Sequence, residues 1–179
     1  MDAIELLKKD HGEVTKLFQR FGASKGGRAA DPVVRKICDE LDVHARIEEE
    51  IFYPAVRRAD AELAQQVDEA LREHGRVKQQ VAALRERTER GGRGANDVGA
   101  AVTALQEDVE HHVTEEEGEM FPRVSEAIGA RERADLGRRL AERKGELAGT
   151  ARGRTPRESG TARKASTRRA KATQRRSKT

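Results

Sequence analysis

The chain has 179 residues and a net charge of +4, and 38% of its residues are charged, 35% hydrophobic and 3% aromatic. This length allows one ordinary domain with an appendage, and the scarcity of aromatic residues argues against a β-sandwich or β-barrel and favours amphipathic helices. The single cysteine, Cys38, excludes an internal disulfide and a cysteine-cluster metal site, and no apolar run approaches the roughly 18 residues of a membrane span.

The N-terminal segment MDAIELLKKDH carries charges where a secretory signal would have its apolar stretch, so we expect an uncleaved, cytoplasmic protein. The same segment begins a first amphipathic helix, whose apolar face follows spacings of three and four residues. That face consists of Ile4, Leu7, His11, Val14, Phe18 and Phe21. We expect Gly22 and the segment SKGGRAADP to end this helix, and Pro32 to begin the next.

Three further helices of similar length follow, each with a histidine on its apolar face. The second presents Val34, Ile37, Leu41, His44, Glu48 and Ile51 or Phe52. The third, which should stop at the glycine-rich segment 91–96, presents Leu63, Val67, Leu71, His74, Val77, Val81 and Leu84. The fourth presents Val98, Val102, Leu105, Val109, His112, Glu116 and Met120. We expect Pro54 to close the main part of the second helix, and Pro122 follows the apolar face of the fourth.

A shorter, mostly charged fifth segment shows Leu136, Leu140 and Leu147 at helical spacing. We therefore predict an all-α fold: an up-down-up-down four-helix bundle over residues 1–148, with a short fifth helix across one end or side. Residues 149–179 carry 11 Lys or Arg and one acid, which leaves residues 1–148 with 25 basic and 31 acidic residues. The C-terminal segment has no large apolar residue to bury, so we predict a disordered basic tail over 149–179.

The basic tail suggests a partner. Its positive charge suits salt-sensitive, non-specific binding of nucleic acid or an anionic surface, and the alternative is a tail that only keeps the protein soluble. It lacks the aromatic residues that stack on bases, so specific readout is not expected.

The chain also contains an internal repeat. Residues 8–18 (KKDHGEVTKLF) resemble residues 71–81 (LREHGRVKQQV), and residues 44–54 (HARIEEEIFYP) resemble residues 112–122 (HVTEEEGEMFP). Each half thus has one histidine on its first helix and a histidine with a glutamate four residues later on its second. The six aligned residues are His11, His44, Glu48, His74, His112 and Glu116.

This constellation predicts a metal site inside the bundle. An ionised glutamate in a helical core costs several kcal/mol unless it is paired, and no lysine or arginine occupies the clear apolar-face positions. A single core histidine is more often structural, but a pattern repeated in both halves favours metal ligands. Imidazole and carboxylate donors suit iron or manganese, with zinc possible, and two carboxylates are enough to bridge two ions. Ferritin-like sites place glutamate three residues before histidine, where this chain has Leu41 and Val109.

Several neighbouring residues are assigned to other roles. His111 lies about 100° around its helix from His112 and is left out of the site. Tyr53, the only tyrosine, is close enough in sequence to approach the metal, but it turns about 140° away from Glu48 on an ideal helix, so we favour a packing residue. The remaining acids of the two glutamate runs are expected to form solvated faces: Glu49, Glu50, Glu115 and Glu117.

These residues and spacings strongly resemble the hemerythrin-like, or HHE cation-binding, family over about residues 1–147. The resemblance implies a four-helix bundle around a non-haem di-iron centre with an oxo or hydroxo bridge; manganese or zinc is less favoured. It implies that the four histidines are terminal ligands and that Glu48 and Glu116 bridge the ions. Oxygen-carrying hemerythrins have a further histidine four residues after the ligand of the third helix, where this chain has Lys78, so we expect a more open or differently capped iron.

The functions that follow from this resemblance depend on open positions at the metal. We expect a protein that binds or senses a small ligand such as dioxygen, nitric oxide or peroxide, or that senses iron availability. The alternative is a peroxide-consuming, catalase-like enzyme of oxidative-stress defence. No separate acid–base constellation is visible, so any reaction would take place at the metals.

Overall fold

The structure, a computed structural model, describes residues 1–24, 30–89 and 95–152, and these are helical apart from short turns. The elements are α1 (Ala3–Gly22), α2 (Asp31–Ile47), η2 (Glu48–Phe52), α3 (Tyr53–Ala59), α4 (Leu63–Glu89), α5 (Ala95–Glu115), η3 (Glu116–Met120), α6 (Phe121–Ala127) and α7 (Ala130–Arg152). The predicted all-α class is confirmed. The predicted loops around 25–29 and 91–94 and the tail from residue 153 onward lie outside the described residues.

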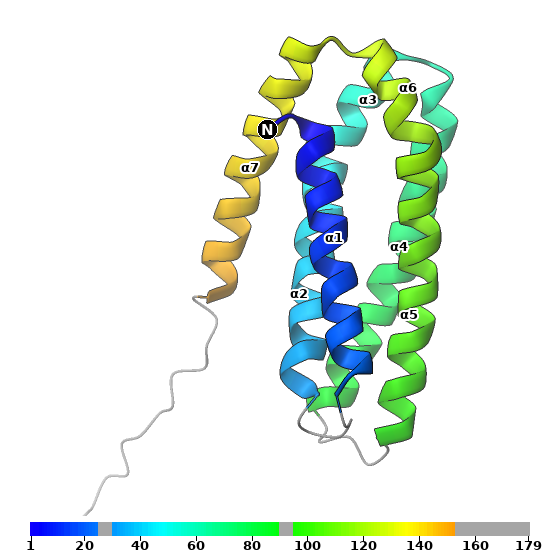
Figure 1. Ribbon diagram of the computed structural model, residues 1–179, viewed down its shortest axis with the longest axis vertical. Coiled ribbons are helices and arrows are strands. Elements are labelled where there is room, and N and C mark those ends of the chain that lie inside the picture. The colour runs from blue at the N-terminus through cyan, green and yellow to red at the C-terminus, as the bar shows by residue number, and fades with distance from the viewer. Residues whose placement is uncertain (25–29, 90–94, 153–179) are drawn as a thin grey trace, which may run out of the picture.

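Helices α1, α2, α4 and α5 form the predicted up-down-up-down bundle (Figure 1). Each of these helices contacts two others, in the cyclic order α1, α2, α4, α5. The first helix begins with reciprocal hydrogen bonds: the Glu5 backbone N–H donates to Asp2 Oδ1 at 3.0 Å, and the Asp2 N–H donates to Glu5 Oε2 at 2.9 Å. Such a capping box satisfies N–H groups that a helix start leaves unpaired, so it fixes where α1 begins.

Two of the four long helices contain a wider, π-helical turn where the sequence predicted an end. In η2 the Tyr53 N–H donates to the Glu48 carbonyl, and in η3 the Phe121 N–H donates to the Glu116 carbonyl, each five residues back. Pro54 and Pro122 then lie in the first turn of α3 and α6, so the main part of each helix ends just before its proline, as expected, and a short helix continues beyond it. A wider turn ahead of a proline eases the clash of its ring with the preceding turn, and the rod continues.

The fifth helix is longer than predicted and lies along the side of the bundle, which is one of the two expected placements. Helix α7 has 23 residues, continues past the predicted boundary at residue 148, and contacts α1 and α2 (Figure 1). Its Leu136 and Leu140 are buried. At Gly137 a methyl group would lie only 2.6 Å from the Met1 carbonyl oxygen, so glycine allows the start of α1 to approach the α7 backbone.

The apolar core consists of two clusters with a polar layer between them. One cluster includes Leu7 and Leu140, and the other includes Val14 and Leu105. Along α1, the buried His11 stands between Leu7 and Val14. The predicted site therefore lies at mid-height in the bundle, with apolar packing on both sides.

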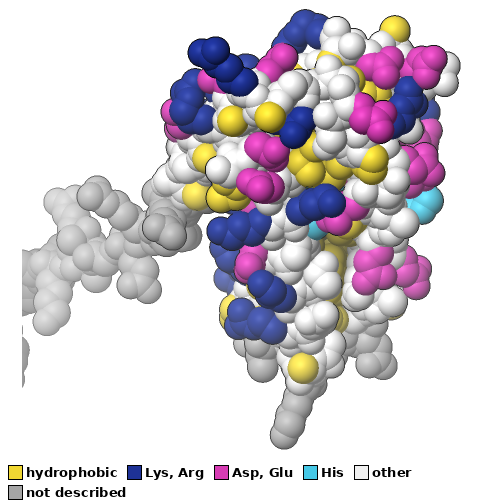
Figure 2. All heavy atoms as spheres, turned by 45° about the horizontal axis from the view of Figure 1, so that its top comes forward, with side chains coloured by type: hydrophobic (Ala, Val, Ile, Leu, Met, Phe, Trp, Pro, Cys, Tyr) yellow, Lys and Arg dark blue, Asp and Glu magenta, His cyan; other side chains and the backbone are white. Residues whose placement is uncertain are grey.

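The outer surface is strongly charged. Figure 2 shows acidic and basic side chains mixed over the face that it draws. Within the described ranges no helix combines the length and the apolar composition needed to cross a bilayer.

Candidate metal centre

The four predicted histidines meet in one layer of the bundle. His11 comes from α1, His44 from α2, His74 from α4 and His112 from α5, and none is more than 6% exposed. Their Nε2 atoms form two close pairs, 3.1 Å apart in His11 and His44 and 3.2 Å apart in His74 and His112. Four helices thus contribute one imidazole each, with the Nε2 atoms directed to the middle of the layer.

The two predicted glutamates lie between these histidine pairs. Glu48 Oε2 is 3.2 Å from the Nε2 of His44 and 3.4 Å from that of His74, so it connects one histidine of each pair. Glu116 Oε2 lies in the same way between the other two histidines, 3.3 Å and 3.6 Å from their Nε2 atoms. The structure therefore brings all six predicted residues together. One oxygen of each carboxylate, Oε2, lies between the two histidine pairs.

The carboxylates lack the partners that buried charges require. Both are at most 1% exposed, and neither oxygen of Glu48 nor Oε2 of Glu116 has a hydrogen-bond partner. Burial, together with the neighbouring Glu116, holds the pKa of Glu48 well above its usual value. Among the buried side chains of the described residues none is a lysine or arginine. A cation between the carboxylates would satisfy these oxygens, so the residues fit a metal ion.

The histidines respond to the same carboxylates. Burial disfavours a charged imidazole, but the nearby carboxylates, Glu116 foremost, together outweigh it and raise the pKa of both His11 and His112. For His44 burial dominates and lowers the pKa to about 4. Positive charge near Glu116 is therefore favoured, whether protons or metal ions carry it.

Each histidine also faces a carboxylate with its outer ring nitrogen, Nδ1. Three contacts are hydrogen bonds donated by Nδ1 and the fourth is longer than a hydrogen bond: His11 to Glu117 (2.8 Å), His74 to Glu49 (3.0 Å), His112 to Glu73 (2.9 Å) and His44 to Asp10 (3.9 Å). Such partners orient a ligand ring and keep the other nitrogen free to bind metal. The arrangement is the same in both halves of the repeat.

The expectation that Glu49 and Glu117 are solvated was therefore wrong. Both are half-buried. Glu49 contacts His74 and Glu117 contacts His11, because each carboxylate turns towards the helix that carries its histidine. Their position directly after Glu48 and Glu116 in both repeats was the signal that could have identified them. Glu50 does lie at the surface, where it accepts hydrogen bonds from Arg143.

Comparison with known proteins identifies the family. The model of the hemerythrin HHE cation binding domain matches residues 2–124. The chain belongs to this family. Among solved structures, a hemerythrin HHE cation binding domain-containing protein from Mycobacterium kansasii is 26% identical and superposes with a TM-score of 0.72, covering 86% of this chain and 91% of that one. A search of curated proteins finds no match.

The lysine four residues after His74 lies outside the histidine layer. Lys78 points outward, and its Nζ donates to both oxygens of Glu49 at 2.7 and 2.6 Å. Since Glu49 in turn accepts from His74, Lys78 acts on the layer only through that carboxylate. The hydrogen bond from His74, with the nearby Lys78 ammonium, lowers the pKa of Glu49 to about 2.

Tyr53 packs in the apolar core, as expected, but its hydroxyl also reaches the same layer. Its hydroxyl donates to Glu116 Oε1 at 2.9 Å and lies 3.3 Å from the Nε2 of His74. The reason is the π-helical turn, because its five-residue hydrogen bond brings Tyr53 back onto the face of Glu48. The HHE domain thus has a phenol beside one histidine pair.

A small apolar cavity adjoins the histidines on the opposite side of the layer from Tyr53. Its volume is about 20 Å³, and its lining combines the four histidines with aliphatic side chains such as Val77 and Val109. A space of this size holds one water-sized molecule. A ligand of one or two heavy atoms could therefore stand against the histidine layer.

Proposed function

We propose that this HHE domain holds two iron ions between the histidine pairs and binds or senses a small ligand there. The observation that carries the proposal is the pair of buried carboxylate oxygens of Glu48 and Glu116, each shared between the two histidine pairs. His11 and His44 would serve one ion, His74 and His112 the other, and the two glutamates would bridge them.

The donor chemistry supports iron. Imidazole and carboxylate ligands suit iron or manganese, and zinc is less suited because structural zinc sites are usually closed and tetrahedral. When bound, iron would supply redox chemistry and coordination positions for dioxygen, nitric oxide or peroxide. The small apolar cavity beside the histidines supports a ligand of that size.

The protein's own residues would set the conditions for ligand binding. The carboxylates on the outer nitrogens keep each Nε2 directed to the metal, and the apolar layers on both sides limit the access of water. The Tyr53 hydroxyl is a hydrogen-bond donor next to Glu116, at the edge of the layer.

Tyr53 also favours the alternative function, a peroxide-consuming enzyme of oxidative-stress defence. A hydroxyl held at hydrogen-bond distance from both a carboxylate and an imidazole could hold or pass a proton beside a reacting ligand. The sensing and enzymatic functions use the same centre and differ in turnover.

A spectroscopic experiment tests the proposal. Full-length protein loaded with ferrous iron without oxygen should change its near-ultraviolet absorption on adding dioxygen or nitric oxide, and the Glu48→Gln variant should not. Peroxide consumption by the same samples separates the two functions: turnover no faster than free iron would reject the enzyme. An absence of any ligand-dependent spectral change would contradict both.

We also propose a cytoplasmic location. A second proposal is that the basic tail, residues 149–179, binds nucleic acid non-specifically, and the support for it is the excess of Lys and Arg over acids in that segment. Removing residues 153–179 should abolish salt-sensitive retention on DNA; unchanged retention would contradict this role.

A further inference from the structure

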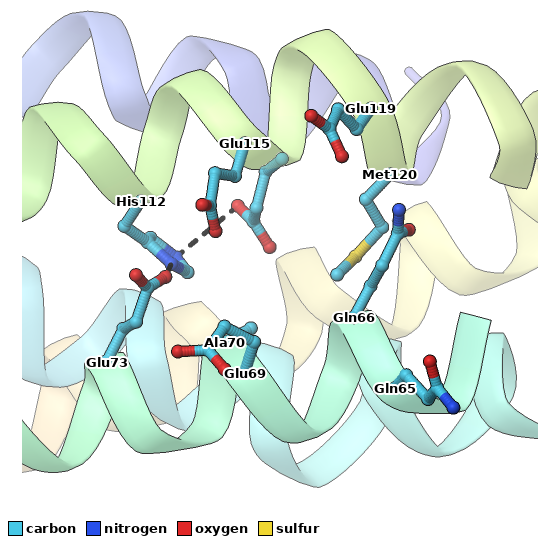
Figure 3. Close-up of a pocket in the computed structure, with 10 residues that line it drawn as sticks. Gln65, Gln66, Glu69, Ala70, Glu73, His112, Glu115, Glu119 and Met120 are labelled. Atoms are coloured by element: carbon cyan, nitrogen blue, oxygen red, sulfur yellow. Dashed lines mark hydrogen bonds and ion pairs between the residues drawn. The ribbon is translucent and has the colours of Figure 1, made fainter. Parts of the chain in front are cut away.

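A second cavity opens beside the histidine layer, between α4 and the rod formed by α5 and η3. Its volume is about 250 Å³, and side chains from the two rods face each other across it (Figure 3). His112 and Glu116 line it and are buried, so the cavity reaches the layer itself. Much of the rest of its wall is acidic: Glu69, Glu73, Glu115 and Glu119.

Three residues beside this cavity form a compact set of possible metal ligands. His111 Nε2 lies 3.2 Å from Glu115 Oε1 and 3.5 Å from Glu73 Oε1, and the three donor atoms lie within 4.8 Å of one another. His111 and Glu115 are accessible from solvent, whereas Glu73 is only 2% exposed. One imidazole and two carboxylates are donors that divalent transition-metal ions accept.

The inner end of the cavity attracts a cation through a buried carboxylate. Glu116 is 1% exposed, lines the cavity, and has an oxygen, Oε2, without a hydrogen-bond partner. Glu73 connects the two ends, because its Oε2 accepts from His112 Nδ1 at 2.9 Å while its Oε1 faces His111. A cation held at the outer cluster would therefore lie one side chain away from the layer.

Nearby positive charge keeps the outer cluster weak. Arg76 lies 3.3 Å from Glu73 Oε1, and Arg72 pairs with Glu69. A site through which ions pass must release them, so partial neutralisation suits a transient site rather than a storage site. Of the two sites, the inner one, where Oε2 of Glu116 has no hydrogen-bond partner, is then the stronger.

We propose that Glu73, His111 and Glu115 form a transient site for a divalent metal cation, and that the acidic cavity is the route by which such cations reach the histidine layer. This inference rests on the proposed function, since it supplies the metal that the layer would hold. An acidic approach accelerates cation capture by electrostatic attraction and leaves the final affinity to the inner ligands.

The test follows metal loading rather than activity. Metal-free full-length protein is mixed with Co²⁺ in a stopped-flow instrument, the cobalt absorption bands give the loading rate, and metal analysis after desalting gives the final content. The variants are Glu115→Gln with Glu119→Gln, and separately His111→Ala. The matched control is Glu142→Gln with Glu146→Gln, which changes the net charge equally on exposed residues of α7.

The route predicts that both cavity variants load about tenfold more slowly but reach the wild-type cobalt content, while the α7 control loads at the wild-type rate. Equal rates in all four proteins would overturn the route and leave the proposed metal centre intact. A lower final content in the cavity variants would overturn the transient role. Failure of the wild type to take up cobalt would reject the metal centre, and the route with it.

Discussion

The partners of the outer nitrogens, Nδ1, set the orientation and the protonation of the inner nitrogens, Nε2, of the histidines. Where Nδ1 donates to a carboxylate, as in His74 with Glu49, Nε2 keeps its lone pair for a metal and the ring cannot rotate away. Lys78 holds that carboxylate from the other side. The affinity of the site for metal should therefore depend on residues that are not ligands themselves.

Glu49→Gln should weaken metal binding about 10- to 100-fold, since it replaces the charged acceptor of His74. Glu50→Gln, one residue further, is the control, because Glu50 pairs with Arg143 at the surface. Competition with a coloured chelator measures both affinities. Equal affinities of the two variants would contradict an orienting role for Glu49.

Metal binding should also depend on pH in a defined direction. Nearby carboxylates, Glu116 foremost, raise the pKa of His11 and His112 above the usual 6.5 despite burial, so protons compete for these imidazoles more strongly than for a free histidine. A metal must displace them, and its affinity should fall as the pH decreases from 8 to 6. Titration in weak buffer with a pH indicator should show proton release on loading; an affinity independent of pH over this range would contradict the assignment.

At the scale of helices, the two π-helical turns explain what the sequence could and could not predict. The spacing of His11, His44 and the other ligands follows the α-helical period, which is why their meeting point could be predicted. Tyr53 could not be placed in this way, because η2 changes the angle between residues just before it. Glu49 was missed for a different reason: a run of glutamates is usually solvated, and its repeated position directly after Glu48 and Glu116 was not used, although its partner His74 lies on a neighbouring helix.

The position of α7 gives a prediction at the same scale. Gly137→Ala should destabilise the protein by about 1 to 3 kcal/mol, because its methyl group would lie 2.6 Å from the Met1 carbonyl oxygen. Gly145→Ala in the same helix meets no atom within 4 Å and should stabilise it by about 0.5 to 1 kcal/mol. Urea unfolding of both variants measures the difference, and equal stabilities would contradict the close crossing of α1 and α7.

For the whole molecule, the polar layer proposed to bind metal lowers the stability of the metal-free fold. Two carboxylates and four imidazoles separate two apolar clusters that would otherwise be continuous. Because the pKa of Glu48 is raised in the folded chain, its carboxyl favours folding at low pH and opposes it as the pH rises towards neutrality. Function and stability therefore make opposite demands on this residue.

Glu48→Gln should raise the stability of the metal-free protein at pH 7 by about 1 to 3 kcal/mol, since it removes an ionisable carboxyl that is buried without a hydrogen-bond partner. The exposed Glu107→Gln should change it by less than about 0.5 kcal/mol. Thermal unfolding in the presence of a chelator measures both. The wild type should gain stability from added metal and the Glu48 variant should not; a Glu48 variant less stable than the metal-free wild type would contradict this reasoning.

The most direct test of the account is the metal content of the full-length protein after anaerobic loading with ferrous iron and desalting. The arrangement of two histidine pairs joined by two shared carboxylates predicts about two irons per chain in the wild type. It predicts a marked loss when Glu48 and Glu116 are both replaced by glutamine. A wild type that retains no iron, or a double variant that retains as much as the wild type, would contradict the claim that these side chains form a metal centre.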